Sequence, residues 1–188
     1  MYTNNNQKKI SHGFTLVELM VTLTVSAILA TAAAPSFANL IARNKVLIQT
    51  NAILESLYLA RSYAIVKQRN VHVCHLDPET NSSCSEDRNY NSKWSHGWLV
   101  FADNNGDRNF DGNDELLQVV EMPDSVNIVF NQRGRLRFFP DGSARSSGFY
   151  ICDRQQNSFQ HIYLLHSGRA RINQKMNAKQ KSTCGNLT

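Results

Sequence analysis

The chain has 188 residues, of which 41% are apolar and 19% are charged, and its formal net charge is +5 at pH 7. This composition is ordinary for one globular domain with an apolar anchor, and the length excludes several large domains. Residues 126–188 contain ten Lys and Arg but two Asp and Glu, a net charge of +8, whereas residues 1–125 carry −3. One strongly basic end predicts a polyanionic partner or a neighbouring acidic subunit.

The first predicted element is an apolar segment that follows a short leader. Residues 1–13 are polar and basic, and Phe14 opens an apolar run that reaches about Ala38. Because roughly 20 apolar residues span a bilayer core, this run predicts a membrane helix with the leader on its cytoplasmic side. Glu18 is the one charge in the run, and a carboxylate at bilayer depth costs roughly 2.5–3.5 kcal/mol, so we expect it to have a partner.

Residues 13–18 read Gly-Phe-Thr-Leu-Val-Glu and resemble the cleavage motif of a type IV prepilin. The resemblance implies that prepilin peptidase cuts after Gly13, that the new amine of Phe14 is methylated, and that Glu18 pairs with the terminal amine of another pilin subunit. The chain would then cross the inner membrane once before assembly and afterwards be extracellular in the pilus, with its globular domain outside the cytoplasm. The alternative is a signal anchor with a stray Glu. An ordinary secretory signal, however, has its apolar region before the cut.

Residues 14 to about 67 are predicted to form one long helix. Its first half, residues 14–38, is apolar nearly all round, and we expect it to pack on other subunits. Its second half is amphipathic, and we expect its apolar stripe to pack on a sheet of its own domain; the stripe consists of Leu40, Leu47, Leu54, Leu57, Ala60 and Ala64. Pro35 lacks a backbone donor, so a kink is expected there.

Short strands are predicted in series after the helix, because the apolar period changes to two. They are expected at residues 71–76, 97–102, 116–121, 126–130, 135–139, 148–152, 161–166 and 170–173. One long helix followed by short strands predicts an α+β fold, with one antiparallel sheet or two small sheets on the helix. The globular domain then covers residues 39–173, and residues 174–188 are expected to form an extended basic tail.

The four cysteines, Cys74, Cys84, Cys152 and Cys184, predict disulfides if the domain lies outside the cytoplasm. Four cysteines allow three sets of pairings. We favour Cys74–Cys84, because it closes a short polar loop, and Cys152–Cys184, because it ties down the tail. Zinc is the alternative, but no C-x-x-C pair is present and the spacings are irregular.

An acidic loop at residues 103–115 has oxygen-bearing side chains at the spacing of a calcium loop, namely Asp103, Asn105, Asp107, Asn109 and Asp114. Arg108, however, stands where the tight turn of such a loop needs Gly, and Asp, Asn and Gly are also common in hairpin loops. We therefore favour a hairpin with no metal or cofactor, and calcium stays open. No residues supply the nucleophile, phosphate cradle or buried carboxyl that catalysis needs, so no enzymatic activity is expected.

Five motifs follow one another through the rest of the chain, at residues 94–103, 105–107, 114–117, 138–143 and 168–171. Their succession resembles the FimT/GspH branch of the type IV pilins, which comprises minor pilins and a minor pseudopilin of type II secretion. The resemblance implies a long N-terminal helix that carries a small β-rich domain of two sheets, without enzymatic activity. The loop around Cys74 and Cys84 and the residues beyond Asn173 match nothing in that pattern.

The basic end supplies the candidate site, because arginines at alternate positions share one face of a strand and present paired donors to phosphate. The predicted site centres on Arg169 and Arg171, aided by Lys175, Lys179 and Lys181, with Arg133, Arg135, Arg137 and Arg145 as extensions. In FimT-like minor pilins the Gly-Arg-x-Arg element, here residues 168–171, is associated with DNA binding in natural transformation.

We therefore predict a minor pilin whose soluble domain, from about Ala38 onward, binds double-stranded DNA with little sequence preference. Contacts are expected mainly at phosphates, because nothing resembles a recognition helix for the major groove. The alternative is a structural minor pilin or type II secretion pseudopilin that initiates or caps a filament. In that case the basic face is solvated or docks another subunit.

Overall fold

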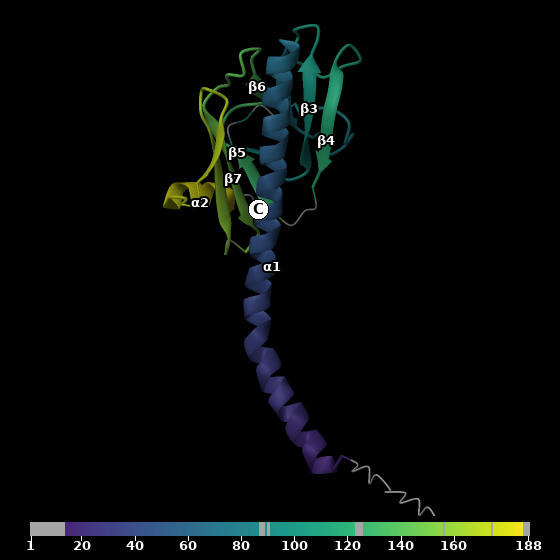
Figure 1. Cartoon of the computed structure of the whole chain (residues 1–188), viewed down its shortest axis with the longest axis vertical. Coiled ribbons are helices and arrows are strands. Elements are labelled where there is room, and N and C mark those ends of the chain that lie inside the picture. The colour runs from purple at the N-terminus through teal and green to yellow at the C-terminus, as the bar shows by residue number, and fades with distance from the viewer. Residues whose placement is uncertain are drawn as a thin grey trace, which may run out of the picture. The chain divides into compact units, whose positions relative to one another are not determined.

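The computed structural model describes residues 14–86, 89, 91–122, 126–155, 157–173 and 175–185, apart from the side chains of residues 32–35. The chain divides into two compact units, Met1–Ala38 and Asn39–Thr188. The elements are labelled in Figure 1 where there is room. They are α1 (Leu16–Lys67), β1 (Asn70–His75), β2 (Ser92–Lys93), β3 (Gly97–Asp103), β4 (Glu115–Glu121), β5 (Val126–Phe130), β6 (Leu136–Phe138), β7 (Ser147–Asp153), β8 (Phe159–Leu164), β9 (Ala170–Asn173) and α2 (Ala178–Gly185).

Helix α1 begins with a reciprocal pair of hydrogen bonds between Thr15 and Glu18. The Glu18 amide donates to Thr15 Oγ1 over 3.2 Å, and the Thr15 amide donates to Glu18 Oε2 over 3.4 Å. This is a capping box, which satisfies amides that the first helical turn leaves unpaired. Within the described residues, α1 is the one helix long and apolar enough to cross a membrane by length and composition. The kink expected at Pro35 falls within residues 32–35, outside the described side chains.

The second unit buries one face of α1 from Val46 onward. The buried apolar residues recur at helical spacing and are Val46, Ile53, Leu57, Ala60 and Ala64. The predicted stripe is correct at Leu57, Ala60 and Ala64 but wrong at its start, since Leu40 and Leu47 are 52% and 46% exposed. Leu40 precedes Val46, the first buried apolar residue of the helix, whereas Leu47 follows Val46 directly and so lies about 100° round the helix from it, off the buried face.

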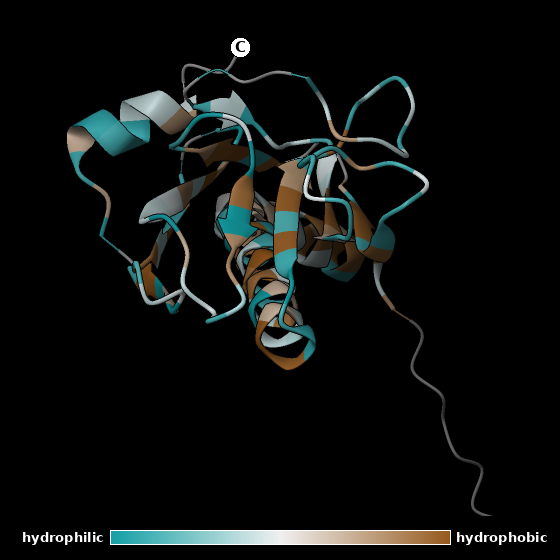
Figure 2. Cartoon of the chain, turned by 90° about the horizontal axis from the view of Figure 1, so that it is seen from above, coloured by the Kyte–Doolittle hydropathy of each residue, from teal (hydrophilic) through white to brown (hydrophobic). Residues whose placement is uncertain are grey.

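Two antiparallel sheets complete the domain, which confirms the predicted α+β fold. One sheet has four strands in the order β4-β3-β1-β6, and the other has five in the order β2-β5-β7-β8-β9. Hydrophilic and hydrophobic residues alternate along several strands (Figure 2), as expected where one face of a sheet is buried. One hydrophobic core joins α1 to both sheets, with Leu57, Trp98 and Phe149 among its largest side chains.

A short polar chain links α1 to the four-stranded sheet inside this core. Trp98 Nε1 donates to Ser56 Oγ over 2.8 Å, and Ser56 Oγ donates to Gln118 Oε1 over 2.7 Å. Buried polar groups are costly unless they are paired, so these bonds allow an indole and a hydroxyl to lie between helix and sheet. They also fix the register of α1 on β3 and β4.

Disulfides join Cys74 to Cys84 and Cys152 to Cys184, the two pairings favoured from the sequence. The extended tail predicted beyond residue 174 is wrong in part, because residues 178–185 form α2. Asn177 Oδ1 accepts from the Gln180 amide over 2.9 Å, and Gln180 Oε1 accepts from the Asn177 amide over 2.8 Å. This Asn-x-x-Gln pair is a capping box that starts the helix. Cys152, Cys184 and Met176 form a small separate core on which the tail packs.

Candidate functional site

Arg171 lies on the outer face of the five-stranded sheet. Strand β9 pairs with β8, so that Arg171 lies opposite Tyr163 and Ala170 opposite Leu164. Leu164 belongs to the core, and side chains alternate between the two faces of a strand, so Arg171 and Tyr163 face away from the core. Arg169 precedes β9 in the turn and is also exposed. Neither arginine forms an ion pair with a described carboxylate.

The lysines of the tail lie near the same face, because α2 packs on β5 and β7 through the Cys152–Cys184 bond. Lys175 precedes α2, and Lys179 and Lys181 are exposed on it. Lys181 Nζ lies 5.1 Å from the centre of the Phe159 ring, at the distance of a cation–π contact. We call Arg169, Arg171, Lys175, Lys179 and Lys181 the basic tail surface.

The other predicted arginines lie elsewhere, around a cleft of about 730 Å³. The cleft is bounded by β6, the ends of β5 and β7, and loops on either side of β6, and it also takes in part of the β3–β4 loop. Its arginines are Arg108, Arg133, Arg135, Arg137 and Arg145, and we call it the arginine cleft. The predicted strand 135–139 is shorter than expected: only Leu136–Phe138 is strand, and Arg133 and Arg135 precede it in a loop. Arg169 and Arg171 do not line this cleft.

The wall of the arginine cleft combines charge with an aromatic ring. The Arg137 guanidinium lies over the Phe139 ring, 4.1 Å from its centre. Arg135 Nη2 donates to Asn109 Oδ1 over 3.4 Å, which connects the cleft to the β3–β4 loop. Asp107 is the one carboxylate among the described residues that line the cleft. The cleft therefore carries a strong positive charge that a single acid offsets only in part.

His72 adjoins these arginines, and it was not predicted as a site residue from the sequence. It is 1% exposed, and its Nε2 lies 3.2 Å from Asp103 Oδ2. The pKa of His72 is lowered to about 4, mainly by burial and in smaller part by Arg135 and Arg137, while Asp103 opposes the shift. The ring is therefore neutral at pH 7, donates from Nε2 to Asp103, and keeps an acceptor at Nδ1. The position of His72 in a predicted strand is compatible with either a core residue or a site residue. Only the pairing of its strand with those of Phe101 and Arg137 shows that it lies beside the arginine cleft.

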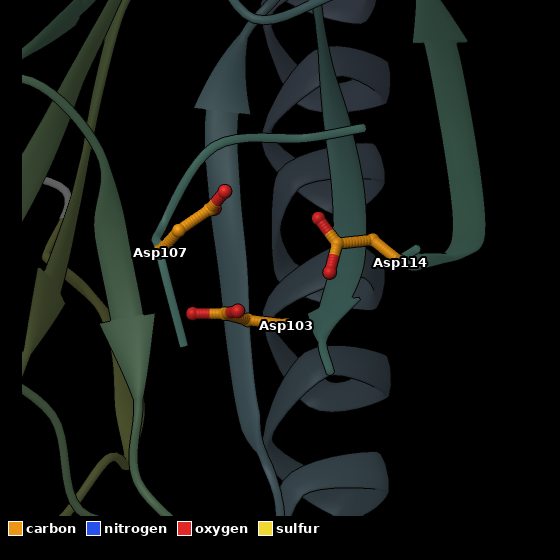
Figure 3. A group of neighbouring side chains, drawn as sticks. All are labelled: Asp103, Asp107 and Asp114. Carbon is orange, nitrogen blue, oxygen red and sulfur yellow. The ribbon is translucent and has the colours of Figure 1, made fainter. Parts of the chain in front are cut away.

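The acidic loop gathers Asp103, Asp107 and Asp114 (Figure 3), with one oxygen of each within 4.8 Å of the others. Of the described residues, these three could hold a cation. The carboxylates already accept backbone hydrogen bonds inside the loop, from Gly106 to Asp103 over 2.7 Å and from Asn109 to Asp107 over 2.7 Å. Such bonds are typical of Asx turns and require no ion. Arg108 adopts φ 68° where a calcium loop needs Gly, and we propose no cation here.

Comparisons with known proteins identify the family of this chain. The family model described as "Type II transport protein GspH" matches residues 49–168. The chain belongs to the GspH family. A second model, "Prokaryotic N-terminal methylation motif", matches residues 8–34. A comparison with curated protein sequences gave no significant match.

Two solved structures are similar to this GspH-family chain. The type IV minor pilin FimU of Pseudomonas aeruginosa is similar with a TM-score of 0.52 and 14% identity, over 70% of this chain and 90% of FimU. The minor pseudopilin EpsH of the Vibrio cholerae type 2 secretion system gives a TM-score of 0.49 and 12% identity, over 69% of this chain and 97% of EpsH. The likeness to FimU shows a pilin-like fold, as the sequence resemblance implied.

Proposed function

We propose that this GspH-family chain is a minor pilin that binds double-stranded DNA through its basic tail surface, for DNA uptake in natural transformation. The observation that carries the proposal is the exposure of Arg171 on an edge strand and of Arg169 in the turn before it, without a described carboxylate to pair with them. Exposed guanidinium groups bind phosphate through paired donors at little desolvation cost. The lysines of α2 extend the same charge.

Assembly with other pilin subunits would place this surface outside the cell. Prepilin peptidase would cut after Gly13, which lies outside the described residues, and the amine of Phe14 would then be methylated. Before assembly, the apolar half of α1 would anchor the chain in the inner membrane. In the filament Glu18 would exchange its capping bond with Thr15 for the terminal amine of a neighbouring subunit.

The strength of binding follows from the kind of contact. Phosphate contacts without base readout give dissociation constants of roughly 10⁻⁴–10⁻⁶ M at physiological salt. Each lost contact reduces the slope of log affinity against log salt by roughly 0.9 on duplex DNA. Sequence should matter little, because no described element resembles a recognition helix.

The test compares two double variants of the full chain in a non-ionic detergent, with a labelled duplex as probe. Arg169→Gln with Arg171→Gln should weaken binding to every duplex alike and lower the salt slope by about two. Arg43→Gln with Lys45→Gln is the matched control, since it removes two exposed positive charges on α1 that are distant in sequence from Arg169 and Arg171. Melting curves of both variants should match that of the parent.

Equal binding by the two folded variants would contradict the proposed site. The alternative, a structural minor pilin or pseudopilin of a type II secretion system, would then be favoured. It is supported by the GspH match, whose description names type II transport.

A further inference from the structure

We infer that the arginine cleft holds an unpaired nucleotide of a single DNA strand, with the phosphate on the arginines and the base against Arg137 and Phe139. This inference rests on the proposed function for its choice of nucleic acid. It concerns a second site, however, which shares no residue with Arg169 and Arg171. Duplex DNA would contact the basic tail surface, and a strand end or unpaired stretch would enter the cleft.

The size of the cleft favours a single nucleotide. Its volume of about 730 Å³ lies within the range of small-molecule sites, roughly 300–1,000 Å³. A base in a duplex is stacked and paired, so it cannot enter such a cleft unless it leaves the stack. An unpaired nucleotide has both its phosphate and its base free.

The charge of the cleft favours phosphate. Arg137 and Arg145 form no ion pair with a described carboxylate, so their donors are not occupied by an acid. The guanidinium of Arg137 is oriented by its contact with Phe139. A planar cation held over an aromatic ring presents a flat face on which a base can stack, the combination that single-strand binders use.

Two side chains that line the cleft, Ser147 and His72, each have a buried polar atom without a hydrogen-bond partner in the described part of the chain. Ser147 is 4% exposed, and its Oγ has no hydrogen-bond partner in the described part of the chain. The same holds for Nδ1 of His72, which is an acceptor because Nε2 donates to Asp103. Leaving a buried donor and a buried acceptor unpaired is unfavourable. A nucleotide carries acceptors and donors together, whereas an ionised carboxylate offers acceptors only.

The first experiment measures binding of the full chain, in a non-ionic detergent, to labelled oligo(dT) of about 12 nucleotides at low salt. Arg137→Gln with Arg145→Gln should weaken oligo(dT) binding about tenfold more than the control pair Arg43→Gln with Lys45→Gln. If the double variant does not fold, Arg145→Gln alone serves, because this side chain is exposed. Equal binding by the folded cleft variant and the control would overturn the inference.

A second probe tests the base contact. An abasic strand of the same length should bind at least about fivefold more weakly than oligo(dT), since stacking of each base contributes to affinity. Phe139→Leu should reduce that difference while it leaves abasic binding unchanged. Equal affinity for the two strands, or displacement of oligo(dT) by an equally charged oligoglutamate, would show a general anion site and overturn the assignment to nucleic acid.

The two proposals fail separately in these assays. If Arg169→Gln with Arg171→Gln weakens duplex binding while the cleft variant keeps its affinity for oligo(dT), the cleft inference fails and the proposed function stands. If only the cleft variant loses affinity, and only for oligo(dT), the cleft inference stands and the basic tail surface is not the duplex site.

Discussion

Removing the Cys152–Cys184 disulfide should destabilise the domain more than removing Cys74–Cys84. The two bonds span 32 and 10 residues. In the chain-entropy model, closing a loop of 32 residues contributes about 3.7 kcal/mol at 25 °C, and closing one of 10 residues contributes about 2.7 kcal/mol. Because Cys152 and Cys184 are both 0% exposed in their small core, replacing them also loses packing.

The assay is urea unfolding of residues 39–188, since the buried residues among those described lie between Val46 and Cys184. Cys152→Ala with Cys184→Ala should lower the free energy of unfolding by about 4 kcal/mol, and Cys74→Ala with Cys84→Ala is the matched control. A helix as short as α2 is marginal alone, so its release should speed tryptic cleavage at Lys179 and Lys181. A smaller loss than in the control, or a tail still resistant to trypsin, would refute this reasoning.

Three further predictions concern the glycine turn, a buried histidine and the N-terminus. Gly168→Ala should lower the free energy of unfolding by about 2–4 kcal/mol, because φ at Gly168 is +72° and an added Cβ would overlap a backbone carbonyl oxygen. Gly112→Ala is the control: the space around Gly112 is open, so this variant should be nearly neutral in the same melting experiment. Burial holds the pKa of His72 at about 4, so on acidification the unfolded chain binds a proton at this residue before the folded chain does. The free energy of unfolding should therefore fall as the pH drops from about 6.5 to about 4. Unfolding measured across that range should show a smaller fall of this free energy in His72→Gln. Replacing Gly13 by a bulkier residue should block leader cleavage, whereas Glu18→Ala should leave cleavage intact and weaken incorporation into filaments, as mass spectrometry and filament blots would report.

Local signals account for the elements that the sequence predicted correctly. These signals depend only on neighbours in the chain: an apolar run of helical length, the alternation of apolar and polar residues at 71–76, and polar loop residues between short strands. Helix α2 was missed although its signal, Asn177 followed by Gln180, is just as local. It was missed because an eight-residue polar helix has no apolar stripe, and its stability comes from a disulfide to a distant strand.

The sequence by itself determined the apolar N-terminal helix, the prepilin-like motif that ends at Glu18, the class of fold and the excess of positive charge near the C-terminus. Only the tertiary structure decided how that charge is divided. Strand β6 pairs with β1, which places Arg137 beside His72 at one end of the four-stranded sheet, while β9 pairs with β8 in the other sheet and directs Arg171 outward. The β1–β6 pairing joins residues up to 67 positions apart in the chain, such as Val71 and Phe138. No periodicity in either segment specifies its partner. The arginine cleft exists because sheet order, rather than sequence spacing, sets which arginines are neighbours.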